Sequence, residues 1–104
     1  MLSLLAMVLV ALGGLGAVAV VYVVMVTIEF LTDWFRARGE RLQTDPDLRA
    51  ITVAEDIRNG NVTYIQGLFD TSLEKFVDSR RVEGKHADER VRSAHAAHQV
   101  AVWG

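Results

Sequence analysis

Apolar side chains fill the first third of the chain almost without interruption. Residues 2–32 contain no Lys or Arg and a single acidic residue, Glu29, near the end of the run. A bilayer core is crossed by about 20 apolar residues in a helix. The pattern therefore predicts a single-pass transmembrane α-helix over residues 1–33, followed by a small α+β cytoplasmic domain.

A cleaved signal peptide fits this run less well than a permanent anchor does. Signal peptides carry a basic start and an apolar stretch of about 7–15 residues. Here no basic side chain precedes the apolar stretch, which is about twice that long. We expect the segment to be retained, as a single-pass span of a bacterial inner (plasma) membrane.

The residues that flank the run predict its orientation. Arginines follow the span but none precedes it, and Lys and Arg favour the cytoplasmic side. The N-terminus should therefore lie outside and the C-terminal domain in the cytoplasm. The expected interface anchors, aromatic rings and arginines at the inner boundary, are Phe30, Trp34, Phe35, Arg36, Arg38 and Arg41.

Two acidic residues at this boundary, Glu29 and Asp33, lie four apart on one helical face. Carboxylates inside a membrane are costly and often functional, so a proton or ion relay is one interpretation. The favoured interpretation is that both lie at headgroup depth, solvated or paired with Arg36 or a neighbouring chain.

Small residues cluster in the middle of the run, over residues 11–17. Small side chains allow the backbones of membrane helices to approach closely. The helical period predicts a smooth helix-packing face made of Ala6, Val10, Gly13, Ala17, Val20 and Val24.

Beyond the run, we expect a juxtamembrane stalk over residues 34–46 and the α+β domain over residues 47–104. Thr52 to Glu55 forms a capping-box pattern, which predicts a short helix that ends at Asn59–Gly60.

Residues 61–70 and 75–82 are typical of two strands joined by a turn at residues 71–74, because β-branched and aromatic residues are frequent in them. A helix over residues 71–83 is the alternative. A final helix over residues 87–98 and a terminal strand over residues 100–103 complete the predicted domain. This last strand is expected to pair with one of the hairpin strands.

Composition excludes several classes of function. The formal net charge is −2, with 11 basic and 13 acidic residues, so no basic excess indicates nucleic-acid binding. The chain has no cysteine, which excludes disulfides and thiolate metal sites.

No pattern of catalytic residues is specific enough to indicate an enzyme, and we expect no cofactor and no small-molecule substrate. His86, His95 and His98 invite a metal interpretation, but the sequence brings no three or four ligands together. Arg80 and Arg81 should point to opposite faces of a strand, so they are not expected to form an anion clamp.

The sequence therefore predicts an accessory or assembly subunit of a larger membrane complex. Its partners would be other transmembrane helices, more often heterologous subunits than copies of itself, and the lipid bilayer. The alternative is a homo-oligomeric ring, pore or holin-like assembly. A third option is an adaptor that offers the edge of its small sheet to an extended peptide.

Overall fold

The computed structural model describes residues 3–58 and 60–103 of the chain. Four helices and five strands are present in this part. In chain order they are α1 (Leu4–Gly13), β1 (Val20–Val26), α2 (Ile28–Arg36), α3 (Gly39–Thr44), β2 (Leu48–Arg58), β3 (Asn61–Asp70), β4 (Lys75–Ala87), α4 (Glu89–Ala94) and β5 (Val100–Trp103).

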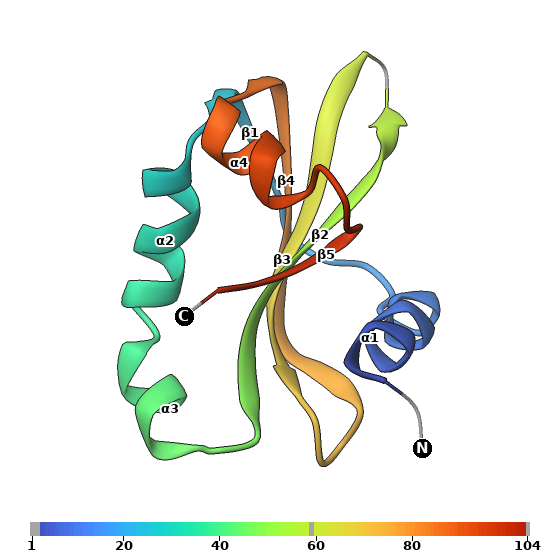
Figure 1. Ribbon diagram of the computed structural model, residues 1–104, viewed down its shortest axis with the longest axis vertical. Helices are drawn as coiled ribbons and strands as arrows, with labels where there is room; N and C mark the ends of the chain where they lie inside the picture. The colour runs from blue at the N-terminus through green and yellow to red at the C-terminus, as the bar shows by residue number, and fades with distance from the viewer. Residues whose placement is uncertain (1–2, 59, 104) are drawn as a thin grey trace.

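The strands form one mixed sheet in the order β1-β4-β3-β2-β5. Strand β1 runs parallel to β4, and all other neighbours are antiparallel. Helices α2 and α3 lie on one side of the sheet and α1 lies on the other, while α4 lies near the end of β1 and β4 (Figure 1). The two edges of the sheet are therefore β1 and β5.

The long apolar run is divided into three elements instead of forming one helix. Helix α1 ends at Gly13, and Gly16 has a φ of +71°, a conformation that ends helical geometry. Residues 20–26, which include five valines, form β1 because β-branched side chains fit a pleated strand. Thr27 then begins α2, since its hydroxyl accepts a hydrogen bond from the Phe30 N–H at 3.0 Å.

No helix within residues 3–58 and 60–103 combines the length and apolar character needed to cross a membrane. The predicted fold class, a transmembrane helix followed by a small α+β domain, is therefore wrong. The predicted location as a single-pass inner-membrane protein, with its N-terminus outside, is wrong for the same reason, because it depended on that span.

The predicted hairpin is confirmed, with β3 and β4 joined by the turn at residues 71–74. The helix predicted from the capping box is wrong, because these residues belong to β2. Ile51 and Val53 are buried on one face of β2 and Thr52 is buried on the other, so packing on both faces overrides the local cap signal. Asn59, part of the predicted end of that helix, lies outside the described residues.

The final helix and the terminal strand are present, although α4 is shorter than predicted. The side chain of Asp88 begins α4 by accepting a hydrogen bond from the Val91 N–H at 2.8 Å. Strand β5 pairs with β2, from Ala50–Trp103 to Val53–Val100, and not with a hairpin strand. The predicted pairing is wrong because β2, which was expected to be helical, takes that place in the sheet.

Both faces of the sheet are covered by apolar side chains. On the α1 face, Val8 of α1 packs with a cluster that includes Ile65 and Phe69 of β3. On the opposite face, Leu31 and Phe35 of α2 belong to two clusters with residues of β2, β3 and β4. Helix packing on both faces fixes the central strands and leaves the edges as the sites for further pairing.

Candidate functional site: the β1 edge

Strand β1 is held to the sheet through its partner β4. The parallel register runs from Val20 opposite Arg81 to Val26 opposite Ala87. A Cβ atom at Gly84 would lie 2.8 Å from Cγ2 of Val26, so the glycine is required for this close approach. Strand β1 therefore lies tightly against β4 on one side only.

The side chains of β1 alternate between exposure and partial burial from Val20 to Val23, after which Val24 and Met25 are both exposed and Val26 is buried. Tyr22 and Val24 are 71% and 74% exposed. Val20 is opposite Arg81 and Arg81 is opposite Ile65, which belongs to the α1-side cluster. Because paired residues point to the same face of a sheet, Val20 and Tyr22 project on the α1 face, beyond the part that α1 covers.

The backbone of β1 also has a free side. The carbonyl of Ala19 accepts a hydrogen bond from the Arg81 N–H at 2.8 Å, so residue 19 points its backbone groups toward β4. Successive residues of a strand alternate in this direction. The pairing is continuous from Val20 to Val23, so Val20 and Tyr22 direct their N–H and C=O groups away from the sheet. The alternation changes after Val23, because Val24 has no paired residue on β4 and the Val26 carbonyl accepts a hydrogen bond from the Asp88 N–H at 3.0 Å.

We name this surface the β1 edge, defined by the outward backbone of β1 and by its exposed side chains. These side chains are Val20, Tyr22, Val24 and Met25. Natural edge strands are usually shielded by charge, by proline, by a bulge or by shortness. The seven residues of β1 contain no charged residue and no proline, so neither charge nor proline shields the β1 edge.

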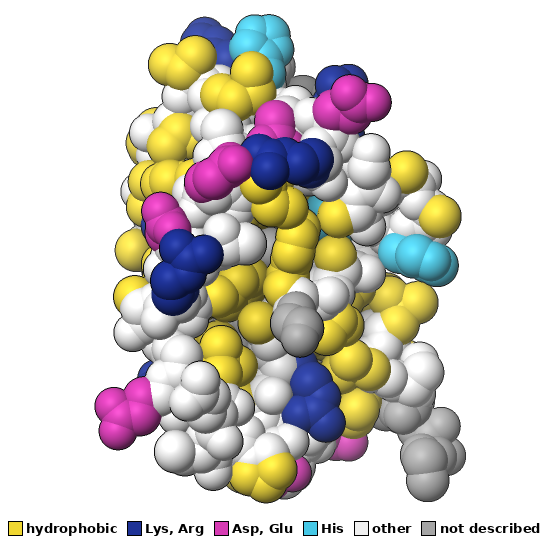
Figure 2. Space-filling view, turned by 60° about the vertical axis from the view of Figure 1, so that its left-hand side comes forward, with side chains coloured by type: hydrophobic (Ala, Val, Ile, Leu, Met, Phe, Trp, Pro, Cys, Tyr) yellow, Lys and Arg dark blue, Asp and Glu magenta, His cyan; other side chains and the backbone are white. Residues whose placement is uncertain are grey.

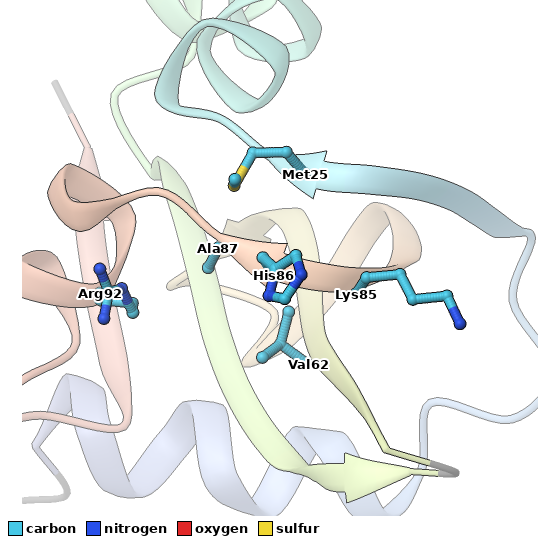
Figure 3. Close-up of a pocket in the computed structure, with 6 residues that line it drawn as sticks. All are labelled: Met25, Val62, Lys85, His86, Ala87 and Arg92. Carbon is cyan, nitrogen blue, oxygen red and sulfur yellow. The ribbon is translucent and has the colours of Figure 1, made fainter.

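Two shallow hollows offer less for recognition. The first, about 340 Å³, borders the β1 edge at Met25 and is lined by Met25, Val62, Lys85, His86, Ala87 and Arg92. Figure 3 shows that the Lys85 side chain extends away from His86 and Arg92, so the cationic groups do not converge on a ligand.

The second hollow, about 300 Å³, lies where α2 and α3 meet β2 and β5. Hydrophobic side chains gather in the middle of this face, between charged groups (Figure 2). Its polar groups already have partners, since Arg36 is 3.0 Å from Asp33 and the Trp103 indole donates to Thr52. Neither hollow brings together the few free polar groups that orient a small ligand.

A polar cluster under α2 fixes that helix to the sheet. The buried Gln66 amide donates to the Leu31 carbonyl at 2.6 Å and accepts from Arg80 at 2.8 Å. The Arg80 guanidinium lies over the Phe30 ring, and burial near Arg38 lowers its pKa. One nitrogen of Arg80, Nη2, has no hydrogen-bond partner among the described residues. Because this atom is buried between the layers, we assign the cluster a structural role.

A second polar cluster fixes β5 and α4 to β2. The Trp103 indole donates to the Thr52 hydroxyl at 2.7 Å, and that hydroxyl lies 2.8 Å from Nε2 of His95. The His98 carbonyl, 3.2 Å from Nδ1 of His95, can only accept, so Nδ1 carries the proton and Nε2 of the neutral ring accepts from the Thr52 hydroxyl. This arrangement suits a neutral imidazole, in agreement with burial that lowers the pKa of His95.

The residues of the predicted helix-packing face are distributed over three kinds of structure. Ala6, Val10 and Gly13 lie on α1, Ala17 lies in the connection, and Val20 and Val24 lie on β1. They do not share one helical face, because the chain turns at Gly14–Ala19. Val20 and Val24, however, both belong to the β1 edge.

The predicted interface anchors lie on α2 and around α3, and several pack against the sheet. Phe35 is buried in a core cluster. Arg38 lies over the Trp34 ring at 3.6 Å and binds Asp78 at 2.6 Å. Phe30 and Arg41 contact Arg80 and Asp78 of β4, and Arg36 pairs with Asp33 of its own helix.

The other candidate residues are separated from one another. Glu29 pairs with Arg90, whose hydrogen bond lowers the pKa of Glu29, and Asp33 pairs with Arg36. Arg80 and Arg81 point to opposite faces, with Arg81 bound to Glu55 at 2.9 Å. Among the described residues, no group of three His, Cys, Asp or Glu side chains is placed to hold a metal ion.

Sequence reasoning missed β1 because it treated residues 2–32 as one segment. The signal was present in the composition of residues 18–26, where six of nine residues are valine. A short apolar run rich in β-branched residues and preceded by glycines is typical of a buried strand as well as of a helix.

Comparison with known proteins gives no further identification of this chain. A scan against protein families, a search of curated proteins and a search of solved structures each found no match. The function must therefore be argued from the geometry of the site.

Proposed function

We propose that this chain is a non-catalytic assembly module that binds an extended apolar strand of a partner protein along the β1 edge. The bound strand would extend the sheet beside β1. This mode of recognition draws affinity from main-chain hydrogen bonds and selectivity from alternate side chains.

The observation that carries the proposal is the coincidence of two free features on one strand. Val20 and Tyr22 present outward backbone groups, and the same residues expose apolar side chains. A strand with only one of these features would offer either hydrogen bonds without selectivity or an apolar patch without register. The absence of charge on β1 indicates an uncharged, apolar partner strand.

The test uses a fluorescent peptide with the sequence VVYVVMV between pairs of lysines, which keep it soluble. We expect its anisotropy to rise with protein concentration, with a Kd in the micromolar range for so small an interface. A peptide with proline in place of its central valine should bind at least about tenfold more weakly, because proline lacks a backbone donor.

Matched variants locate the binding. Val24→Lys places a charge on the β1 edge and should weaken peptide binding at least about tenfold. Val102→Lys makes the same change at a valine of β5 that is 54% exposed, and it should bind like the parent chain. Equal binding by both variants, or no binding by the parent chain, would refute the proposal.

A further inference from the structure

The β1 edge can recognise a strand like itself. In a symmetric dimer, residues near the two-fold axis meet their own copies, so any charge there faces a like charge. Residues 3–28 contain no charged side chain, although the whole chain has 24 of them. The neutrality of this segment removes the usual obstacle to self-pairing.

The direction of the backbone groups also permits self-pairing. Two antiparallel β1 strands can be aligned so that Val20 of one copy lies opposite Tyr22 of the other, with Val21 on the axis. Val20 and Tyr22 both point their N–H and C=O groups outward, so each such pair can exchange two hydrogen bonds. Because of the two-fold symmetry, this hydrogen-bonded pair of residues occurs twice in the dimer.

The side chains match in the same alignment. Val20 and Tyr22 project on the same face of the sheet, so each tyrosine ring would pack on a valine of the second copy. Aromatic and β-branched residues are favourable cross-strand pairs. Val21 would meet the Val21 of the second copy on the opposite face, as a non-hydrogen-bonded pair.

We infer that a second copy of this chain occupies the β1 edge, paired antiparallel about a two-fold axis at Val21, so that one sheet runs through both copies. This inference rests on the proposed function and names its partner. The assembly is closed, because each β1 has a single free side and the shorter β5 strands remain at the two ends. An interface of this kind is small, so the dimer should be weak and should form at micromolar concentrations.

The chain lacks cysteine, which allows a direct test by cross-linking. Val21→Cys places a thiol on the proposed axis, where non-hydrogen-bonded Cα atoms lie about 4.5 Å apart, within the range of a disulfide. Under mild oxidation this variant should form a disulfide-linked dimer at least about tenfold faster than Leu73→Cys. Leu73 is a matched control because it is exposed in the turn between β3 and β4.

Sedimentation of the unmodified chain provides a second measurement that does not depend on the cysteine variant. We expect a concentration-dependent monomer–dimer equilibrium that Val24→Lys shifts toward monomer at least about tenfold and Val102→Lys leaves unchanged. A dimer that persists in Val24→Lys would overturn the inference, because the contact would then lie elsewhere.

The outcomes also separate this inference from the proposed function. A chain that stays monomeric but binds the VVYVVMV peptide through the β1 edge would overturn self-pairing and leave the assembly role intact. A chain that neither dimerises nor binds the peptide would overturn both. Cross-linking of Val21→Cys together with loss of the dimer in Val24→Lys would support both.

Discussion

The two edges of the sheet differ in how they are protected. Strand β1 has seven residues, is parallel to its one neighbour, and exposes Tyr22 and Val24. Strand β5 has four residues, and the Trp103–Thr52–His95 hydrogen bonds attach it to β2 and α4. Shortness and side-chain attachment protect the β5 edge, whereas the β1 edge is left able to pair.

This difference indicates where function lies in a fold without a convergent polar site. Polar clusters in this molecule are used to fix helices and β5 to the sheet, so they have few free groups for ligands. The unused hydrogen-bonding capacity is in the backbone of β1. The following predictions test this contrast, in order of decreasing effect on stability.

Gly84→Val should have the largest effect, because it removes the packing of β1 on β4. A Cβ at this position would lie 2.8 Å from Val26 Cγ2 and 3.3 Å from the Val23 carbonyl oxygen. Overpacking of this kind lowers the free energy of unfolding by about 1–3 kcal/mol. It should also displace β1 from β4, so that the β1 edge no longer binds the peptide. Urea unfolding and peptide binding measure the two effects. Gly39→Ala is the control, since no atom lies within 4 Å of its added Cβ, and a loss of stability equal to that of Gly84→Val would contradict this account.

Thr52→Val should detach the β5 edge. The substitution leaves the Trp103 indole N–H and the His95 ring without their buried partner, which costs about 1–3 kcal/mol. Peptide binding at the β1 edge should be retained, because the two edges lie on opposite sides of the sheet. Thr44→Val, an exposed threonine that bonds within its own helix, is the control for urea unfolding. A Thr52→Val chain as stable as this control would show that the network does not hold β5.

Acidic pH should weaken the β5 edge through His95. Burial lowers the pKa of His95 below its ordinary value of 6.5, so the unfolded chain takes up this proton before the folded chain does. The stabilising contribution of neutral His95 is therefore complete above pH 6.5 and decreases as the pH falls from there toward the lowered pKa. Free energies of unfolding measured across this range should show the decrease, and His95→Gln should remove it. His98→Gln is the control, and it should retain the decrease.

Val24→Lys should have the smallest effect on the stability of a single chain. Val24 is highly exposed, and surface substitutions usually change stability by less than about 0.5 kcal/mol. The same variant should nevertheless reduce peptide binding and self-association strongly. A thermal denaturation curve shifted far below that of Val102→Lys would show that the β1 edge is a structural surface and would contradict this prediction.

The sequence predicts some elements well and others poorly, for physical reasons. The hairpin of β3 and β4 was predictable because β-branched and aromatic residues continue through it and its turn is short. Strand β2 was not, since Thr52 to Glu55 satisfies a helix cap locally while Ile51 and Val53 are buried in the sheet. Burial on both faces of a strand outweighs a local hydrogen-bonding pattern that favours a helix cap.

The candidate site was the least predictable feature. The sequence predicts Val20 and Val24 as members of a helix-packing face, but hydrophobicity alone does not distinguish a helical face from a strand edge. The distinction depends on which strand β1 pairs with and on which side remains free. Both are properties of sheet order, and sheet order joins residues 20–26 to residues 81–87, far along the chain.

Backbone amide hydrogen exchange at Val20 and Tyr22 tests the central claim most directly. These N–H groups point away from β4 and should exchange rapidly in the free monomer. The account predicts that their exchange slows at least about tenfold when saturating VVYVVMV peptide is added to a dilute chain, while the amide of Val102 on β5 is unchanged. Exchange at Val20 and Tyr22 that is equally rapid with and without the peptide would contradict the assignment of the β1 edge as a strand-binding site.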